Sequence, residues 1–188
     1  MIPVIIELAK VGVRMSIDTM RASTARAAIS VGAQIINDVS GGLADPAMLK
    51  TAAELGTPYI AMHWRGQSKD MNSMAVYNNA VDDVISELRE RIKAALDAGI
   101  IKNNLIIDPG IGFAKDAGHN WEIINKIDKF VELGYPVLIG ASRKRFLGGD
   151  TPDEREIATI ALTKRLSTTG IWGVRVHSVK PNKEVLST

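Results

Sequence analysis

The feature that most constrains the fold is a regular alternation of short apolar runs with longer helical patterns along the 188 residues. Most of the runs are rich in Ile, Val and Leu and end in polar residues, as parallel strands covered on both faces do. We predict strands over residues 13–18, 35–38, 59–63, 105–108, 137–140 and 173–177. We predict helices over 4–10, 21–31, 46–55, 78–98, 120–133 and 153–167. The alternation indicates an α/β fold with a parallel sheet.

Glycines mark the ends of five predicted helices. A glycine after the last helical turn is typical of a left-handed residue that terminates a helix. The five are Gly32, Gly56, Gly99, Gly134 and Gly170. No linker or low-complexity stretch interrupts the pattern, so we predict a single domain over residues 1–188.

Composition excludes several classes of protein. The net charge of +2 does not favour nucleic acid as a partner. The chain has no cysteine, which excludes disulfides, thiolate nucleophiles and Cys-based zinc sites. No apolar run reaches the ~18 residues of a membrane span, and no basic leader precedes the first apolar residues. We therefore expect a soluble cytoplasmic protein with no nucleic-acid or membrane partner.

Hydrogen-bond acceptors lie at the ends of three predicted strands. Asp18, Asn37 and Asp108 stand where ligands bind in parallel α/β folds, at the carboxyl ends of strands. A heterocycle with an amino group beside a ring N–H, such as a pterin or a guanine, offers the matching donors. The alternative is a metal held by the two carboxylates. The neutral amide of Asn37 and the nearby Lys144 disfavour it.

Cationic and hydroxyl side chains lie at the ends of the last two predicted strands, and they suit a phosphate group. They are Ser142, Arg143, Lys144, Arg175 and His177. A single ligand with a donor-rich head and an anionic tail would satisfy both the acceptors and these donors. Arg145 is expected to be a solvated residue at a helix start.

A glycine loop follows the strand at 105–108. It lacks the third glycine of the dinucleotide fingerprint, and no phosphate-loop motif occurs, so a doubly wound nucleotide-binding domain ranks last. Phe113 in this loop and Met62 could line the two faces of a flat ligand, although core roles remain open for both. His63 stays unassigned, whereas His119 is expected to be a capping or surface residue.

Six segments taken together resemble dihydropteroate synthase. They are residues 16–19 (Ser-Ile-Asp-Thr), 36–42 (Ile-Asn-Asp-Val-Ser-Gly-Gly), 62–63 (Met-His), 108–113 (Asp-Pro-Gly-Ile-Gly-Phe), 140–146 (Gly-Ala-Ser-Arg-Lys-Arg-Phe) and 175–177 (Arg-Val-His). The resemblance implies a (β/α)8 barrel of the pterin-binding type, cytoplasmic and homodimeric. It also implies a transferase of folate biosynthesis that condenses p-aminobenzoate with 6-hydroxymethyl-7,8-dihydropterin pyrophosphate and releases pyrophosphate, with Mg2+ as cofactor.

The resemblance also implies roles for individual residues. Asp108, Lys144, Arg175 and His177 would be catalytic, and Ser142 would lie near p-aminobenzoate. The pyrophosphate would be bound by Asn37, Arg175 and His177. The pterin would be bound by Asp18, Asn37, Met62, Asp108, Phe113, Lys144 and Arg175.

The chain departs from the family pattern at both ends. We find no segment that corresponds to strands 1 and 2 of the barrel or to the loop that carries the family's Mg2+ ligand. The chain is therefore expected to contain strands 3–8, and no metal ligand can be identified in it. It is also expected to stop within the last helix. These departures leave open a catalytically impaired pterin-binding paralogue or fragment. A pterin-dependent methyltransferase of the same barrel type is a further alternative, which the Ser-Arg-Lys and Arg-Val-His segments disfavour.

Overall fold

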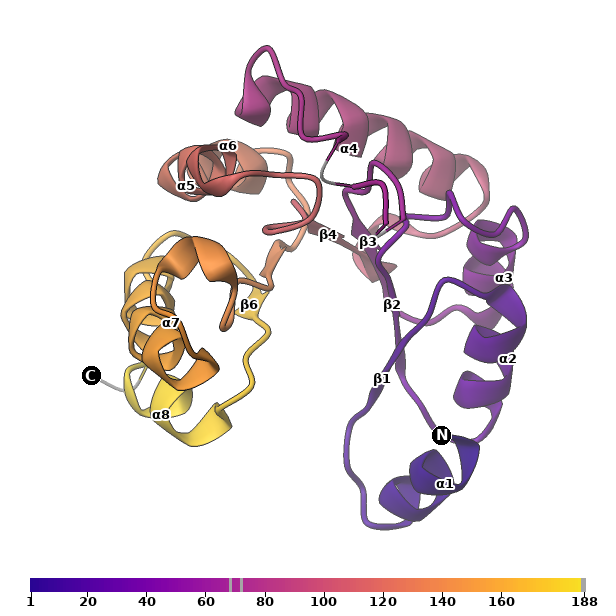
Figure 1. The fold of residues 1–188 in the computed structure, drawn as a ribbon. Coiled ribbons are helices and arrows are strands. Elements are labelled where there is room, and N and C mark those ends of the chain that lie inside the picture. The colour runs from indigo at the N-terminus through magenta and orange to yellow at the C-terminus, as the bar shows by residue number, and fades with distance from the viewer. Residues whose placement is uncertain (68, 72, 187–188) are drawn as a thin grey trace. The chain divides into compact units, whose positions relative to one another are not determined.

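A computed structural model describes residues 1–67, 69–71 and 73–186. Every strand follows a helix in the chain, which confirms the predicted alternation (Figure 1). The strands are β1 (Ser16–Asp18), β2 (Ile35–Asp38), β3 (Tyr59–Met62), β4 (Leu105–Asp108), β5 (Leu138–Ile139) and β6 (Gly173–Val174). The helices are α1 (Ile2–Lys10), α2 (Ala22–Ser30), α3 (Met48–Leu55), α4 (Ala80–Asp97), α5 (Ala117–Asn125), α6 (Asp128–Val131), α7 (Pro152–Leu166) and α8 (Val179–Glu184). Two short 3-10 helices, η1 (Lys102–Asn104) and η2 (Arg145–Leu147), complete the elements of the described chain.

The chain forms two compact units. The first comprises Met1–Trp64 and Ser86–Ile107, and the second comprises Arg65–Ile85 and Asp108–Thr188. Both β4 and α4 contribute residues to each unit. The single domain expected over residues 1–188 stays a prediction.

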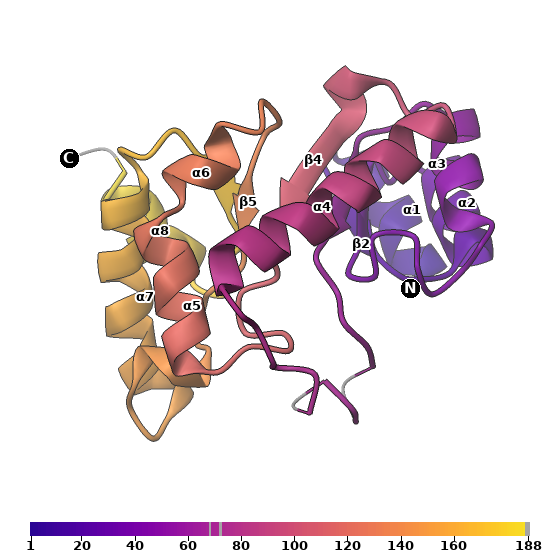
Figure 2. The ribbon, with the colours of Figure 1, turned by 90° about the horizontal axis from the view of Figure 1, so that it is seen from above.

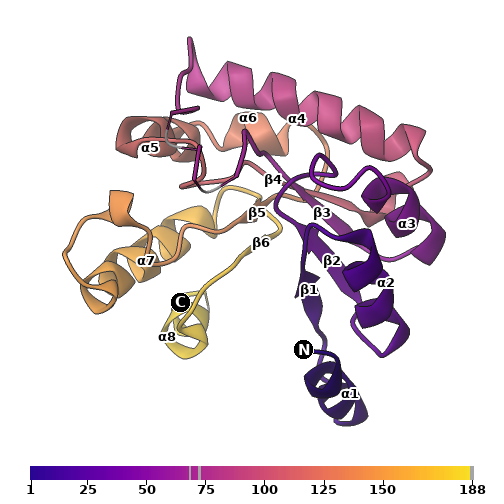
Figure 3. The ribbon, with the colours of Figure 1, turned by 45° about the vertical axis from the view of Figure 1, so that its right-hand side comes forward.

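The first unit is built on a sheet of order β1-β2-β3-β4. The β1–β2 and β2–β3 pairs are parallel, as predicted. Helices α2 and α3 pack against each other beside the sheet (Figure 3). All four residues of β3 are buried, which explains why its sequence is apolar without a break.

The second unit contains the parallel pair β5–β6 and the helices from α5 to α8 (Figure 2). The strand predicted over 173–177 is too long, because regular pairing ends at Val174. One more backbone bond follows, from Arg175 N–H to the Ile139 carbonyl at 2.9 Å. Beyond it the His177 amide donates to the Ser142 hydroxyl instead, at 3.2 Å. A side-chain acceptor thus replaces the sheet partner.

The helix predicted over 120–133 is wrong in its bounds, since the chain forms α5 and α6 with a break between them. Helix α5 also begins earlier than predicted. The Asp116 carboxylate accepts the His119 N–H at 2.8 Å, and the His119 ring accepts the Asp116 N–H in return. This confirms His119 as a capping residue.

The five predicted helix-ending glycines all have positive φ, between +62° and +117°. Left-handed backbone of this kind strains any residue that has a Cβ, which explains glycine at these positions. Among the helices that the structure describes, none combines the length and apolar character needed to cross a membrane.

Candidate functional site

Asp18 and Asn37 lie directly opposite each other in the parallel pair β1–β2. Asn37 Nδ2 donates to Asp18 Oδ2 at 2.8 Å, and Asn37 is 3% exposed. With this amide orientation, the oxygen atoms of both side chains serve as acceptors at the end of the two strands. The first unit therefore brings together the two acceptors that the sequence predicts there.

The turn after β2 is fixed by Asp38, which sequence reasoning did not assign. Its buried carboxylate accepts four hydrogen bonds, from the Ser40 amide and hydroxyl, the Gly42 amide and the Tyr59 hydroxyl, all at 2.7 to 2.8 Å. Burial, followed by the Asp38 charge, raises the pKa of Tyr59 well above its usual value, so the phenol remains a donor. This network positions the backbone next to Asn37.

His63, which the sequence left unassigned, follows β3 and is 1% exposed. Its Nε2 atom lies 2.9 Å from Glu87 Oε2 on α4. Both residues line a cavity of about 100 Å³ in the first unit. Met62, just before it, is also 1% exposed. Its contact with a ligand stays a prediction.

In the second unit, Asp108 ends β4 and is 1% exposed. Its Oδ1 atom accepts the Gly110 N–H at 2.7 Å. Burial raises the pKa of Asp108, and the Gly110 amide together with the charges of Lys144 and Arg175 oppose that rise. The carboxyl group is thus poorly solvated, and additional donors from a ligand would favour its ionised form.

Lys144 lies over the glycine loop. Its Nζ atom hydrogen-bonds to the Ile111 carbonyl and lies 4.2 Å from the centre of the Phe113 ring. Burial lowers the pKa of Lys144 to about 8; the charge of Asp108 opposes this shift and that of Arg175 adds to it. Gly112 makes this approach possible, since a Cβ there would lie 2.5 Å from Lys144 Cδ. The predicted partners Asp108, Phe113 and Lys144 therefore share one unit and one local environment.

The backbone of the glycine loop is held by side chains that the sequence did not indicate. Asn120 is 2% exposed; its Oδ1 accepts the Gly112 N–H at 2.6 Å, and its Nδ2 donates to the Asp116 carbonyl at 2.6 Å. The Tyr77 hydroxyl donates to the carbonyl of Ala114, a residue with φ of +47°. An Asn at the start of a predicted helix, a few residues after a glycine loop, offers no distinctive signal. Only the packing shows its role.

A cleft of about 640 Å³ in the second unit adjoins this loop. Basic side chains dominate its polar lining, which suits an anionic ligand or ligand group. They are Lys115, Arg143, Lys144, Arg145 and Arg155. Arg145 is exposed, as predicted.

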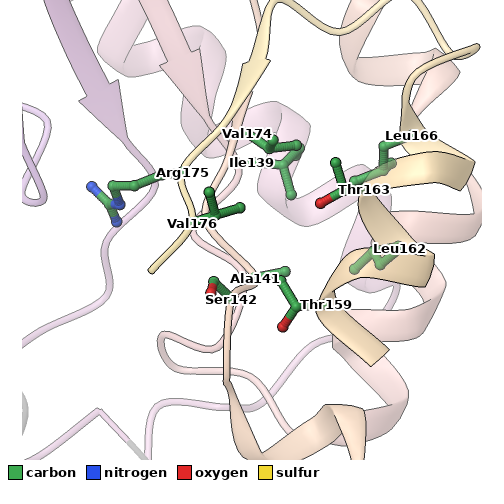
Figure 4. A pocket seen from close by; sticks show the side chains of 10 residues that line it. All are labelled: Ile139, Ala141, Ser142, Thr159, Leu162, Thr163, Leu166, Val174, Arg175 and Val176. Atoms are coloured by element: carbon green, nitrogen blue, oxygen red, sulfur yellow. The ribbon is translucent and has the colours of Figure 1, made fainter. Parts of the chain in front are cut away.

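The turns after β5 and β6 bring Ser142 and His177 together, with Ser142 Oγ 2.9 Å from His177 Nδ1. Arg175 packs against Gly140, where a Cβ would lie 3.1 Å from an Arg175 guanidinium nitrogen. Figure 4 shows the Arg175 side chain directed away from α7 and away from Ile139. The apolar cavity on the α7 side measures about 10 Å³, room for one water molecule at most, so it is part of the core.

The described residues contain no group of three or more His, Asp or Glu side chains that could hold a metal ion. The charged side chains that act on Asp108 are Lys144, Arg175 and Lys115, and their positive charge also disfavours a metal cation there. The residues described here therefore do not fit a resident metal.

Comparison with known proteins identifies the family. A family model described as pterin binding enzyme matches residues 1–177. Dihydropteroate synthase from Mycobacterium leprae is 45% identical, in an alignment that covers 98% of the chain and 69% of that protein. The enzyme of Bacillus subtilis is 43% identical over 95% of the chain and 62% of its own length. The chain belongs to the dihydropteroate synthase family.

Solved structures of dihydropteroate synthases share this fold. The Stenotrophomonas maltophilia enzyme with active-site-bound imidazole has a TM-score of 0.95 and 40% identity, covering 99% of this chain and 72% of that one. The Xanthomonas albilineans enzyme in complex with 7,8-dihydropteroate has a TM-score of 0.91 and 35% identity, covering 99% and 70%. The likeness confirms an α/β fold with a parallel sheet of the dihydropteroate synthase type. The chain spans about two thirds of the length of the curated relatives.

Gly112→Ala is expected to displace Lys144 and so raise its pKa from about 8 toward 10.5, because the added Cβ occupies the position of the lysine stem. An NMR titration of isotope-labelled lysine measures this pKa. Gly148→Ala is the matched control, since Gly148 has a φ of +83° and no heavy atom lies within 4 Å of the position that a Cβ would take there. An unchanged Lys144 pKa in Gly112→Ala would contradict the steric argument.

Lys144 also predicts a pH dependence of stability. Its pKa is about 8 in the folded chain and 10.5 in the unfolded chain. Between these values the unfolded chain holds a proton that the folded chain has lost. The contribution of Lys144 to the free energy of unfolding therefore rises with pH, by up to about 1.4 kcal/mol per pH unit.

Urea unfolding of wild type and Lys144→Met measures this difference between roughly pH 7.5 and roughly pH 10, where the folded and unfolded chains differ most in protonation at this lysine. The stability of wild type should rise relative to that of the variant across this range. If the free energies of unfolding of the two proteins changed with pH in parallel, the lowered pKa of Lys144 would be contradicted.

Proposed function

We propose that this chain supplies the pterin- and pyrophosphate-binding residues of a dihydropteroate synthase. The reaction condenses p-aminobenzoate with 6-hydroxymethyl-7,8-dihydropterin pyrophosphate and gives 7,8-dihydropteroate and pyrophosphate. The observation that carries the proposal is the buried Asp108 carboxyl group beside Lys144 and Arg175, in a chain that belongs to this family. Structures of the Xanthomonas albilineans relative with 4-aminobenzoic acid and with 7,8-dihydropteroate support the choice of substrates.

The pterin ring requires acceptors for its amino group and ring N–H, together with apolar surfaces for its faces. Asp18, Asn37 and Asp108 provide the acceptors in our proposal, and Lys144 donates to a ring acceptor. Met62, Phe113 and Arg175 line the faces. The support within each unit is the Asn37–Asp18 hydrogen bond and the contact of Lys144 with the Phe113 ring.

The pyrophosphate requires hydrogen-bond donors and positive charge. Arg175 provides both in our proposal, and the His177 ring and the Asn37 amide provide further donors. Ser142 lies near p-aminobenzoate in this proposal. The hydrogen-bonding contact between Ser142 and His177 supports placing the p-aminobenzoate and the pyrophosphate next to each other in the second unit.

The chemistry follows from charge. The bond from the pterin methylene carbon to the pyrophosphate oxygen breaks with its electron pair, and the nitrogen of p-aminobenzoate then forms a bond to the cationic carbon. The resulting ammonium nitrogen gives one proton to the departing pyrophosphate or to water, which leaves the secondary amine of 7,8-dihydropteroate. Positive charge develops on the pterin and negative charge on the departing pyrophosphate. Ionised Asp108 stabilises the first, and Arg175 and His177 stabilise the second, as preorganised groups that need little rearrangement.

Several finer statements belong to the same proposal. The six strands correspond to strands 3–8 of an eight-stranded barrel, and the functional protein is a cytoplasmic homodimer. Mg2+ is expected from the family resemblance, but the described residues do not form a site for it, so no step above depends on it.

Arg175→Ala is expected to weaken the binding of inorganic pyrophosphate about 10- to 100-fold, the loss typical of one charged hydrogen-bonding partner. Calorimetry measures the affinity. Arg14→Ala is the control, because Arg14 is exposed in the first unit and lies outside the proposed site. Equal affinity in wild type and Arg175→Ala would show that the pyrophosphate binds elsewhere.

The reaction itself is tested with Asp108→Asn, which keeps the shape of the side chain but cannot carry its charge. We expect kcat/KM for dihydropteroate formation to fall at least about 100-fold, since a preorganised charge at the reacting centre is lost. Product is measured by chromatography, with circular dichroism as the check of folding. If wild type binds pterin but forms no product with or without Mg2+, the impaired pterin-binding paralogue becomes the better description.

A further inference from the structure

Glu156 on α7 is a largely buried carboxylate of the second unit that the proposed chemistry does not use. Its side chain is 12% exposed. Oε2 accepts the Arg143 Nε–H at 2.7 Å, and Oε1 accepts a hydrogen from Asn182 Nδ2 at 2.9 Å. Burial alone would raise the pKa of Glu156, but the hydrogen bonds from Arg143 and Asn182 more than offset it and lower the pKa. The group is therefore an ionised acceptor with two directed donors.

The same donors reach the turn after β6. Arg143 Nη2 donates to Ser178 Oγ at 2.9 Å, and Asn182 Nδ2 donates to the Ser178 carbonyl at 2.8 Å. Asn182 is 2% exposed, and its Oδ1 accepts the Thr163 hydroxyl at 2.6 Å. Arg143, Glu156, Ser178 and Asn182, which we call the turn clamp, thus join the turns after β5 and β6 to α7 and α8.

Arg143 has a left-handed backbone with φ of +58°, a conformation that costs a residue with a Cβ about 1–2 kcal/mol. The Arg143 N–H is fixed by a bond to Thr159 Oγ1 at 3.0 Å, and Figure 4 shows Thr159 on the face of α7 turned toward Ala141. The left-handed backbone at Arg143 lets the residues before and after it contact different parts of the second unit. Ser142 contacts His177, while Lys144 contacts the glycine loop.

Arg143 is therefore not a free phosphate donor of the kind that its sequence position predicts. Its guanidinium group donates to Glu156 through Nε and to Ser178 through Nη2. The charge of Arg143 is neutralised by the Glu156 carboxylate, and its donors are directed at the protein. Its role is to join the two turns.

We propose that the turn clamp is a positioning device for the anion subsite, in which Glu156 acts through Arg143 and Ser178 to hold His177 where a pyrophosphate binds. This inference rests on the proposed function, because that function assigns the anion to Arg175 and His177. Lys144 has its own contacts with Ile111 and Phe113. Weakening the clamp therefore affects the anion subsite and spares the pterin subsite.

The test uses Glu156→Gln in the full chain. A glutamine amide presents a donor where the carboxylate accepts, so one of its two hydrogen bonds is lost. By calorimetry, we expect the affinity for inorganic pyrophosphate to fall about 5- to 20-fold, as loss of one charged hydrogen bond implies. The affinity for free pterin should stay within about twofold. Asp153→Asn is the matched control, since it removes an exposed carboxylate from the same helix.

A second measurement does not depend on any ligand. The His177 amide donates to Ser142 Oγ, so its hydrogen exchange reports directly on the junction of the two turns. Exchange at His177 should be at least about tenfold faster in Glu156→Gln and unchanged in Asp153→Asn. Ser178→Ala, which removes the hydroxyl that contacts both Arg143 and Glu156, should show a smaller change in the same direction.

The outcomes separate the two hypotheses. If wild type does not bind pyrophosphate, the proposed function is contradicted, and the exchange rates still decide whether the clamp orders the turn. If Glu156→Gln leaves both exchange and pyrophosphate affinity unchanged, the clamp is refuted. If it weakens pterin and pyrophosphate equally and lowers the melting temperature, Glu156 is a general stabilising residue and the positioning role is wrong.

Discussion

Burial of the Asp108 carboxyl group is the constraint on which the rest of the second unit depends. A buried carboxylate is costly unless donors surround it, and here the protein supplies one backbone amide and the charges of nearby cations. Its pKa is therefore raised while that of Lys144 is lowered. Both groups are poorly solvated in the same environment. A ligand that carries both donors and acceptors, such as the pterin of the proposed function, would relieve both costs at once.

The glycine loop shows how the fold keeps that environment in place. Gly112 permits the lysine stem to approach, and Asn120 and Tyr77 satisfy backbone groups of the loop that would otherwise lack a partner. Preorganisation of this kind lowers the reorganisation required when charge develops. In our proposal the turn clamp extends the same principle to the anion subsite, because it fixes a left-handed Arg143 between Ser142 and Lys144.

Much of the fold could be predicted from the chain. Apolar runs indicated the positions of the strands, and glycines indicated the helix ends, because both signals are local and recur along the sequence. The errors lie where tertiary contacts override the local pattern. The predicted helix at 120–133 is divided in two, with Ile127 between the pieces buried at 3% exposure. The last strand ends early because the Ser142 hydroxyl takes the His177 amide that a sheet partner would have bonded.

The sequence by itself determined the chemical types at the strand ends and the family they resemble, since residue type and order are properties of the chain. It did not reveal Asp38, Asn120, Gly140 or the Glu156–Asn182 pair as supports of the site. Such roles depend on contacts between residues far apart in the chain, and a common residue type in a polar segment carries no local sign of them. The tertiary structure alone decided which polar groups became buried and which donors face them. Burial shifts the pKa values of Tyr59, Asp108 and Lys144, and hydrogen bonds shift that of Glu156.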